Sequence, residues 1–194
     1  MTRRRMLPAS NLPFFLASFT WNYGLGMTWL VVPLYAYSKG LSGAEIGMLF
    51  SVPSIAQLAI NLIGGAYVDR FGGKRIMLAS SVLLAAGAAA MPFARDFWSL
   101  FAAQTILVLA RATFWPANWS IAADLPGDRG VQAGRLNAIT NLGQILGNGS
   151  CGFILALGGF DMSFAVLAAM GLGALTLGTG TRQLPRKNFS GQGL

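Results

Sequence analysis

The chain has 194 residues, of which 54% are hydrophobic and only 10% are charged, with a net charge of +8. Soluble domains carry roughly 25% charged residues, so this composition excludes an ordinary water-exposed surface. The basic residues are scattered between apolar runs, which argues against a nucleic-acid-binding protein. The sequence has no histidine and a single cysteine, Cys151. We therefore expect no intrachain disulfide, no metal site, no cofactor and no conventional enzyme active site.

Six apolar runs follow one another along the chain, each near the roughly 20 residues that a helix needs to cross a bilayer. They are Leu12–Tyr37, Ile46–Val68, Ile76–Phe93, Phe97–Ala123, Leu136–Leu157 and Met162–Leu177. Short turn-rich breaks separate them, including a Gly-Gly-Phe-Asp segment at residues 158–161. The sequence thus predicts an all-α membrane protein with six transmembrane helices over residues 12–180. A basic cytoplasmic N-terminus (1–11) and a cytoplasmic tail (181–194) flank them.

Lysine and arginine in the breaks predict the orientation, because cytoplasmic loops are enriched in these residues. With six spans, the other side of the membrane carries only Lys39 and Arg95. The cytoplasmic side carries Arg3, Arg4, Arg5, Arg70, Lys74, Arg75, Arg129, Arg135, Arg182, Arg186 and Lys187. This asymmetry predicts that both termini are cytoplasmic, and it holds only for an even number of spans.

The break after the second run reads Gly-Ala-Tyr-Val-Asp-Arg-Phe-Gly-Gly-Lys-Arg over residues 65–75. It resembles the signature loop of the major facilitator superfamily: glycine, three residues, aspartate, a basic residue, one residue, glycine, then basic residues. It also lies where that family has it, between the second and third helices. Gly73 departs from the basic residue usual there, while Lys74 and Arg75 keep the basic cluster. After the fourth run, residues 124–130 resemble the family's acidic, then Arg-Gly, element.

The resemblance implies the N-terminal six-helix half of a secondary transporter, made of two inverted three-helix repeats. It implies a small-molecule substrate, alternating access, and a multi-pass protein in the lipid bilayer, which we take to be the bacterial inner membrane. The family's substrate site lies between two halves. A second half is therefore expected, as a missing continuation, a separate chain or a second copy. The alternative is a six-helix membrane scaffold or regulatory protein that transports nothing.

In the family, the two loops form a cytoplasmic charge relay that helps to hold one end of the transporter shut. Carried over by position, its members here are Asp69, Arg70, Arg75, Asp124 and Arg129. The alternative is that these charges only anchor helix ends at the membrane surface. Exposed ion pairs contribute about 0–1 kcal/mol each, which suits a latch that must also open.

Arg111 is the charge that the sequence places deepest in the membrane. It lies roughly 20 Å from either end of the fourth run at 1.5 Å per residue, near the bilayer midplane. A charge there is expensive, so we expect it to face a cavity or a partner. No acidic residue lies inside any run, so an anionic substrate is one candidate counter-charge. The family often carries an arginine here that is linked to coupling or substrate binding. The alternative is a structural interhelical hydrogen bond.

Polar residues that share helical faces are the other candidates for substrate contact. Gln104, Arg111, Trp115 and Asn118 share a face of the fourth run, and Asn22 and Trp29 share a face of the first. In the family these two helices line the central cavity. For the tryptophans, packing or an interfacial position is an equal alternative.

The fifth run carries an amide stripe that includes Asn141 and Gln144. Unsatisfied amides are costly in lipid, so this stripe either forms interhelical hydrogen bonds or lines a solvated cavity. Gly143 and Gly147 lie beside it and predict close helix packing, because small residues let backbones approach. We assign the same packing role to Gly65 and Gly72 in the signature loop.

Overall fold

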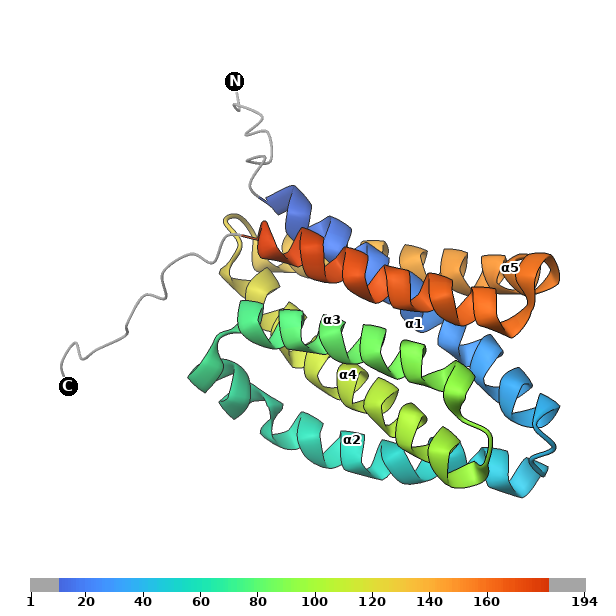
Figure 1. The fold of residues 1–194 in the computed structure, drawn as a ribbon. Coiled ribbons are helices and arrows are strands. Elements are labelled where there is room, and N and C mark those ends of the chain that lie inside the picture. Colours follow the sequence, from blue (N-terminus) through green and yellow to red (C-terminus); the bar gives the residue numbers. More distant parts are fainter. Residues whose placement is uncertain (1–10, 182–194) are drawn as a thin grey trace.

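The structure is a computed structural model that describes residues 11–181, and this part of the chain is almost entirely helical, without a strand. The elements are α1 (Leu12–Ser38), α2 (Gly43–Phe71), α3 (Gly73–Ala90), the short 3₁₀ helix η2 (Met91–Phe93), α4 (Phe97–Asp124) and α5 (Arg129–Thr179). They lie side by side as one elongated bundle (Figure 1).

Helix α5 is divided by two glycines. Gly158 and Gly159 have non-helical backbone angles, and Gly159 has a φ of 67°, which favours glycine. At this point the chain doubles back, so residues 129–157 and 160–179 form two antiparallel arms (Figure 1). The break lies where the sequence predicts the boundary between the fifth and sixth runs.

Four helices are long and apolar enough to cross a membrane: α2, α3 together with η2, α4, and α5. Helix α1 has 27 residues but is not one of the four. Polar side chains such as Ser18, Asn22 and Thr28 lower its hydropathy, and all three are buried by the surrounding helices. A crossing by α1, and separate crossings by the two arms of α5, therefore remain predictions.

The starts of α2, α4 and α5 are capped by side chains in the preceding turns. Ser42 and Glu45 form a capping box at the start of α2. The Asp96 carboxylate accepts hydrogen bonds from the backbone N–H groups of Ser99 and Trp98, at 3.0 and 2.9 Å. The Ser99 N–H, above all, lowers the pKa of Asp96 below its ordinary value. These caps satisfy donors that a helix leaves unpaired, so each turn ends cleanly at the helix start.

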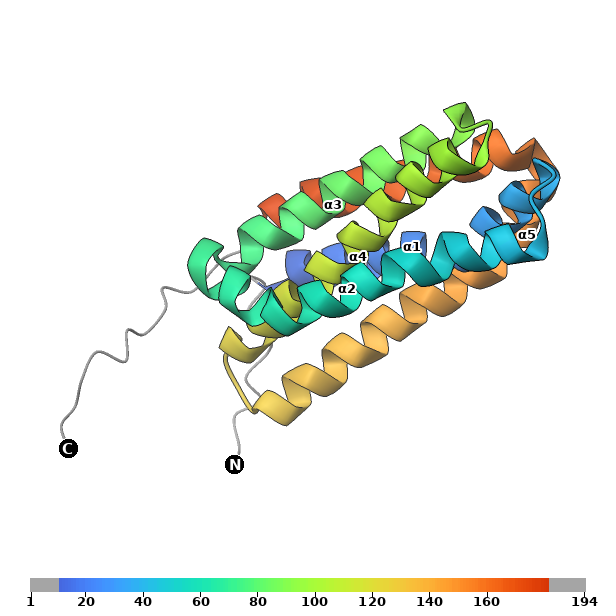
Figure 2. The ribbon, with the colours of Figure 1, turned by 90° about the horizontal axis from the view of Figure 1, so that it is seen from below.

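The closest helix contact joins α1 to the first arm of α5. A Cβ added at Gly143 would lie 2.6 Å from the carbonyl oxygen of Phe19. One added at Gly147 would overlap the carbonyl oxygen of Tyr23. Glycine at these two positions is therefore what lets the two backbones touch. Figure 2 shows this arm running along one side of the bundle, away from α3.

The two glycines assigned to packing in the signature loop behave differently. A Cβ at Gly65 would meet no atom within 4 Å, so Gly65 is not a packing position in this structure. Its neighbour Gly64 is one, because a Cβ there would lie 2.7 Å from Cγ of Pro116 in α4. Gly72 lies in the turn between α2 and α3 with a φ of 84°. Its conformational role is thus the turn itself.

Candidate functional site

Arg111 lies in the middle of α4 and is half-buried. Its Nε donates a hydrogen bond of 2.8 Å to Oε1 of Gln57 in α2. Its Cζ lies 4.9 Å from the ring centroid of Trp29 in α1. Three helices thus hold one cation in place, by a charge-assisted hydrogen bond and a cation–π contact.

Arg111 lines a small recess between α1, α2, α3 and α4, together with Thr28, Phe50 and Gln104. The recess has a volume of about 10 Å³, room for about one water molecule. Gln104 is only 4% exposed, and its Oε1 accepts no hydrogen bond from residues 11–181. Within the described residues, the guanidinium donates only through Nε. The recess therefore holds unused donors on Arg111 and an unused acceptor on Gln104.

Other predicted site residues lie in a buried polar network. The side-chain amide of Asn22 donates to the carbonyl oxygen of Ser18 at 2.8 Å. Gln144 donates to Oδ1 of Asn22 at 3.0 Å, and Asn118 donates to the Ser18 hydroxyl at 3.2 Å. This network ties α1 to α4 and to the first arm of α5. Its amides are used for packing between helices in this structure.

The remaining two residues lie outside both groups. Trp115 packs at a ring-centroid distance of 5.8 Å against Phe114, edge to face. Phe114 in turn stacks on Trp21 of α1 at 3.7 Å, and both rings are fully buried. Asn141 is exposed on the first arm of α5. The structure therefore groups Arg111, Trp29 and Gln104 in a recess and leaves Trp115 and Asn141 apart from it.

The five residues of the predicted charge relay lie at one end of the bundle. Asp69 and Arg70 lie at the end of α2, Arg75 at the start of α3, Asp124 at the end of α4 and Arg129 at the start of α5. These ends gather on the left of Figure 1. Within residues 11–181, Asp124 forms no ion pair with Arg75 or Arg129. The structure thus brings the charges to one end, and a relay among them remains a prediction.

Lys74 makes contacts at the same end of the bundle, and the sequence analysis did not single it out. Its Nζ donates hydrogen bonds of 2.6 Å to the carbonyl oxygens of Thr179 and Thr181. The start of α3 is thereby tied to the end of α5. Lysine near a helix C-terminus also interacts favourably with the helix dipole.

Gln57 is the second residue that the sequence analysis missed. It lies in the middle of α2, and it is half-buried. An amide inside a predicted span was the available signal, because such a group needs a partner in lipid, but Asn61 four residues further on gives the same signal. Sequence spacing alone does not say that the partner is Arg111 on another helix.

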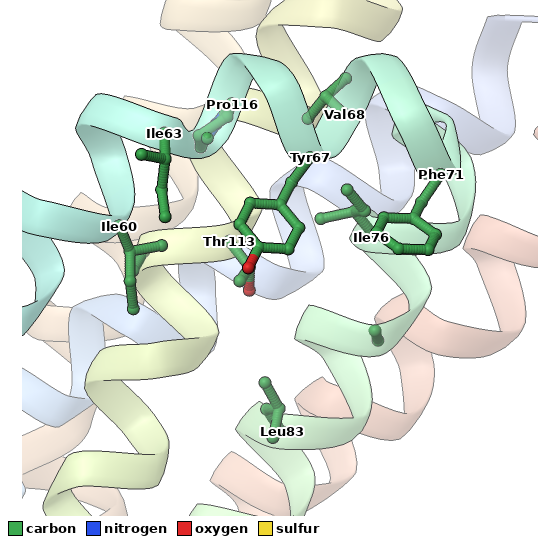
Figure 3. Close-up of a pocket in the computed structure, with 12 residues that line it drawn as sticks. Ile60, Ile63, Tyr67, Val68, Phe71, Ile76, Leu83, Thr113 and Pro116 are labelled. Atoms are coloured by element: carbon green, nitrogen blue, oxygen red, sulfur yellow. The ribbon is translucent and has the colours of Figure 1, made fainter.

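A larger groove between α2, α3 and α4 is apolar. It has a volume of about 280 Å³, and its lining includes Ile60, Tyr67, Phe71, Leu83 and Pro116. Figure 3 shows the Tyr67 and Phe71 rings side by side at its edge. The two rings stack at a centroid distance of 6.1 Å. Among the described residues, no charged side chain lines the groove, so this lining offers a solute no charge.

The chain matches the family model of the Major Facilitator Superfamily over residues 14–193. The chain therefore belongs to this superfamily, whose members are membrane transporters, and its apolar helices are those of an integral membrane protein. It is 26% identical over 167 residues to the quinolone resistance protein NorA of Staphylococcus aureus, covering 85% of this chain and 43% of NorA. It is 27% identical over 176 residues to multidrug resistance protein 1 of Bacillus subtilis, covering 87% and 45%. The chain thus spans about half the length of these curated relatives.

Proposed function

We propose that this chain is the first six-helix half of a secondary active transporter that moves a small solute by alternating access. The observation that carries the proposal is Arg111, a cation in the middle of α4 that is held by Gln57 and Trp29 beside an open recess. A charge at this depth is expensive unless it has a use or a partner. Since its terminal nitrogens have no acceptor within residues 11–181, we assign them to the substrate or to the second half.

The pattern of helix contacts supports two inverted three-helix repeats. If α1, α2 and α3 correspond to α4 and the two arms of α5, the contact of α1 with the first arm corresponds to the contact of α4 with α2. Helix α1 meets the first arm at Gly143 and Gly147, α2 packs on α4, and α3 meets the second arm at Gly171, where an added Cβ would lie 2.7 Å from the backbone nitrogen of Ala85. The basic end of α2 and the basic starts of α3 and α5 then face the cytoplasm. A bacterial plasma membrane fits the two bacterial relatives.

For the substrate, we propose an aromatic, drug-sized solute, an anionic one being the natural partner of Arg111. The names of the relatives concern resistance to quinolones and to many drugs. Trp29 is 48% exposed beside Arg111, so a flat ring and a negative group have adjacent partners. The recess is too small for such a solute, so we expect it to widen when the halves rock apart.

The test is accumulation of norfloxacin, a quinolone whose carboxylate is the negative group that Arg111 would bind, in bacterial cells that lack their own drug pumps. The chain is expressed alone and as a tandem of two copies joined by a flexible linker. We expect lower accumulation in at least one form, and we expect Arg111→Ala to abolish the effect. Arg135→Ala, which changes an exposed arginine of α5, is the matched control with the same change in charge.

The alternative is a six-helix scaffold that transports nothing, and one observation favours it. Asn22, Asn118 and Gln144 are used in hydrogen bonds between helices, as a scaffold requires. If Arg111→Ala and the parent behave alike in every preparation at equal expression, transport by this chain is contradicted and the scaffold is favoured.

A further inference from the structure

Three turns of the chain meet at the end of the bundle opposite the signature loop. They are the α1–α2 turn, the turn between η2 and α4, and the bend of α5, all on the right of Figure 1. They enclose an open cup of about 570 Å³, whose lining includes Tyr35, Ser38, Lys39, Arg95 and Asp161. The cup contains both cations that the sequence places at this end.

Tyr35 holds the walls of the cup together. It is 4% exposed, and its hydroxyl donates to the carbonyl oxygens of Pro92 and Ala94, each at 3.3 Å. The ring also makes edge-to-face contacts with Phe160 and Phe164 at 5.1 and 5.0 Å. One side chain of α1 thus contacts both other turns, so the cup is formed before any ligand arrives.

The charge of the cup is positive. Nζ of Lys39 lies 4.9 Å from the Tyr35 ring centroid. Within the described residues, neither Lys39 nor Arg95 forms an ion pair, and Asp161 is the single acid in the lining. Two cations against one carboxylate leave a net attraction for one negative group.

Exposed aromatic residues beside these turns indicate where the cup lies relative to the membrane. Tyr37 is 73% exposed, Phe93 is 82% exposed and Trp98 is 74% exposed. Aromatic side chains of this kind gather at the membrane–water interface, at the level of the lipid head groups. The cup therefore opens where lipid phosphates lie.

We propose that this cup binds the phosphate of an anionic phospholipid such as phosphatidylglycerol. Lys39 and Arg95 supply the positive charge, and Asp161 limits the affinity by like-charge repulsion. The inference rests on placement of the protein in a membrane and not on the transport proposal. It assigns the lipid to the leaflet that faces away from the signature loop.

The test is native mass spectrometry of the purified chain in detergent with added phosphatidylglycerol, counting the lipid molecules retained. A cation near the membrane surface contributes about fivefold in affinity, so Lys39→Gln with Arg95→Gln should weaken binding by about 25-fold. Asp161→Asn should strengthen binding about fivefold. Arg135→Gln, at the other end of the bundle, is the matched control and should change nothing.

The double variant should bind the lipid more weakly and Asp161→Asn more strongly. Because poor folding cannot strengthen binding, Asp161→Asn keeps the test decisive even if the double variant folds poorly. Unchanged retention in the double variant, weaker binding in Asp161→Asn, or an equal loss in Arg135→Gln would each overturn the proposal. Competition with phosphatidylcholine and with soluble glycerol phosphate distinguishes a lipid phosphate from a free one. If glycerol phosphate displaces phosphatidylglycerol at equal concentration, the cup is a soluble-anion site and the lipid assignment is wrong.

Discussion

Replacing Gly143 with alanine tests the close contact between α1 and the first arm of α5. The added Cβ would lie 2.6 Å from the carbonyl oxygen of Phe19, whereas ordinary contacts begin at 3.4 Å. The two helices must therefore separate by roughly 0.8 Å along their contact. Overpacking of this kind costs about 1–3 kcal/mol. Alanine recovers about 0.5–1 kcal/mol through its higher helix propensity.

We therefore expect Gly143→Ala to lower the free energy of unfolding by about 1–2 kcal/mol. For a chain of this length that corresponds to a drop in Tm of about 3–6 °C. The assay is thermal unfolding in detergent, followed by far-ultraviolet circular dichroism. Gly149→Ala is the matched control, because a Cβ there meets no atom within 4 Å. That variant should melt at or above the parent.

The contact geometry is refuted if Gly143→Ala melts at or above the Gly149→Ala variant. Helix propensity would then outweigh packing at both positions. The α1–α5 interface would have room for a methyl group, and glycine at 143 would have no packing role.

Three further predictions concern a cap, the core and the candidate site. The pKa of Asp96 is lowered, so its carboxylate stabilises the fold at neutral pH and this contribution is lost as the pH falls through that lowered pKa. Asp96→Asn should therefore melt below the parent at neutral pH and together with it in acid. Phe114→Ala should cost about 3–5 kcal/mol in a denaturation measurement, because the ring is fully buried. Phe153→Ala, at a ring that is 69% exposed, should cost less than about 0.5 kcal/mol. Gln57→Leu should weaken the Arg111-dependent effect on accumulation by about tenfold or more, since a hydrogen bond to a charged group contributes about 1.5–3 kcal/mol.

Each of these predictions has a clear contrary result. An Asp96→Asn deficit that persists in acid would show that the carboxylate charge is not its source. Equal effects of the two phenylalanine variants would contradict the burial of Phe114. Full activity of Gln57→Leu would show that Gln57 does not position Arg111. Gln57→Glu is the control for that variant, because it keeps an acceptor for Nε.

The helices and their order could be predicted from the sequence, because long apolar runs and short breaks are local properties. The break at Gly158 and Gly159 is an example, because two adjacent glycines between two apolar runs predict it without any information about distant residues. The family could be recognised for the same reason, from loop residues that lie close together in the chain.

The contacts between helices could not be predicted, because they depend on how each helix is rotated. Gly64 and Gly65 are adjacent and identical, yet only Gly64 faces Pro116. Arg111 could be placed in the middle of the fourth helix by counting residues. Its partner Gln57 lies 54 residues away on another helix, and no periodicity links the two. The amides of Asn22 and Gln144 lie on separate stripes that the sequence presents as candidate cavity walls, but in the fold they bind one another.

The tight bend of α5 has a consequence for biosynthesis. Gly158 and Gly159 leave no polar loop between the two arms. No hydrophilic segment can therefore hold the first arm at the membrane surface while the second arm is being synthesised. If both arms cross the membrane, as the sequence predicts, they must enter the lipid together, as one hairpin, carrying Asp161 through the bilayer in the same step. Lengthening this bend would therefore alter the insertion of the two arms during synthesis, before the protein has folded.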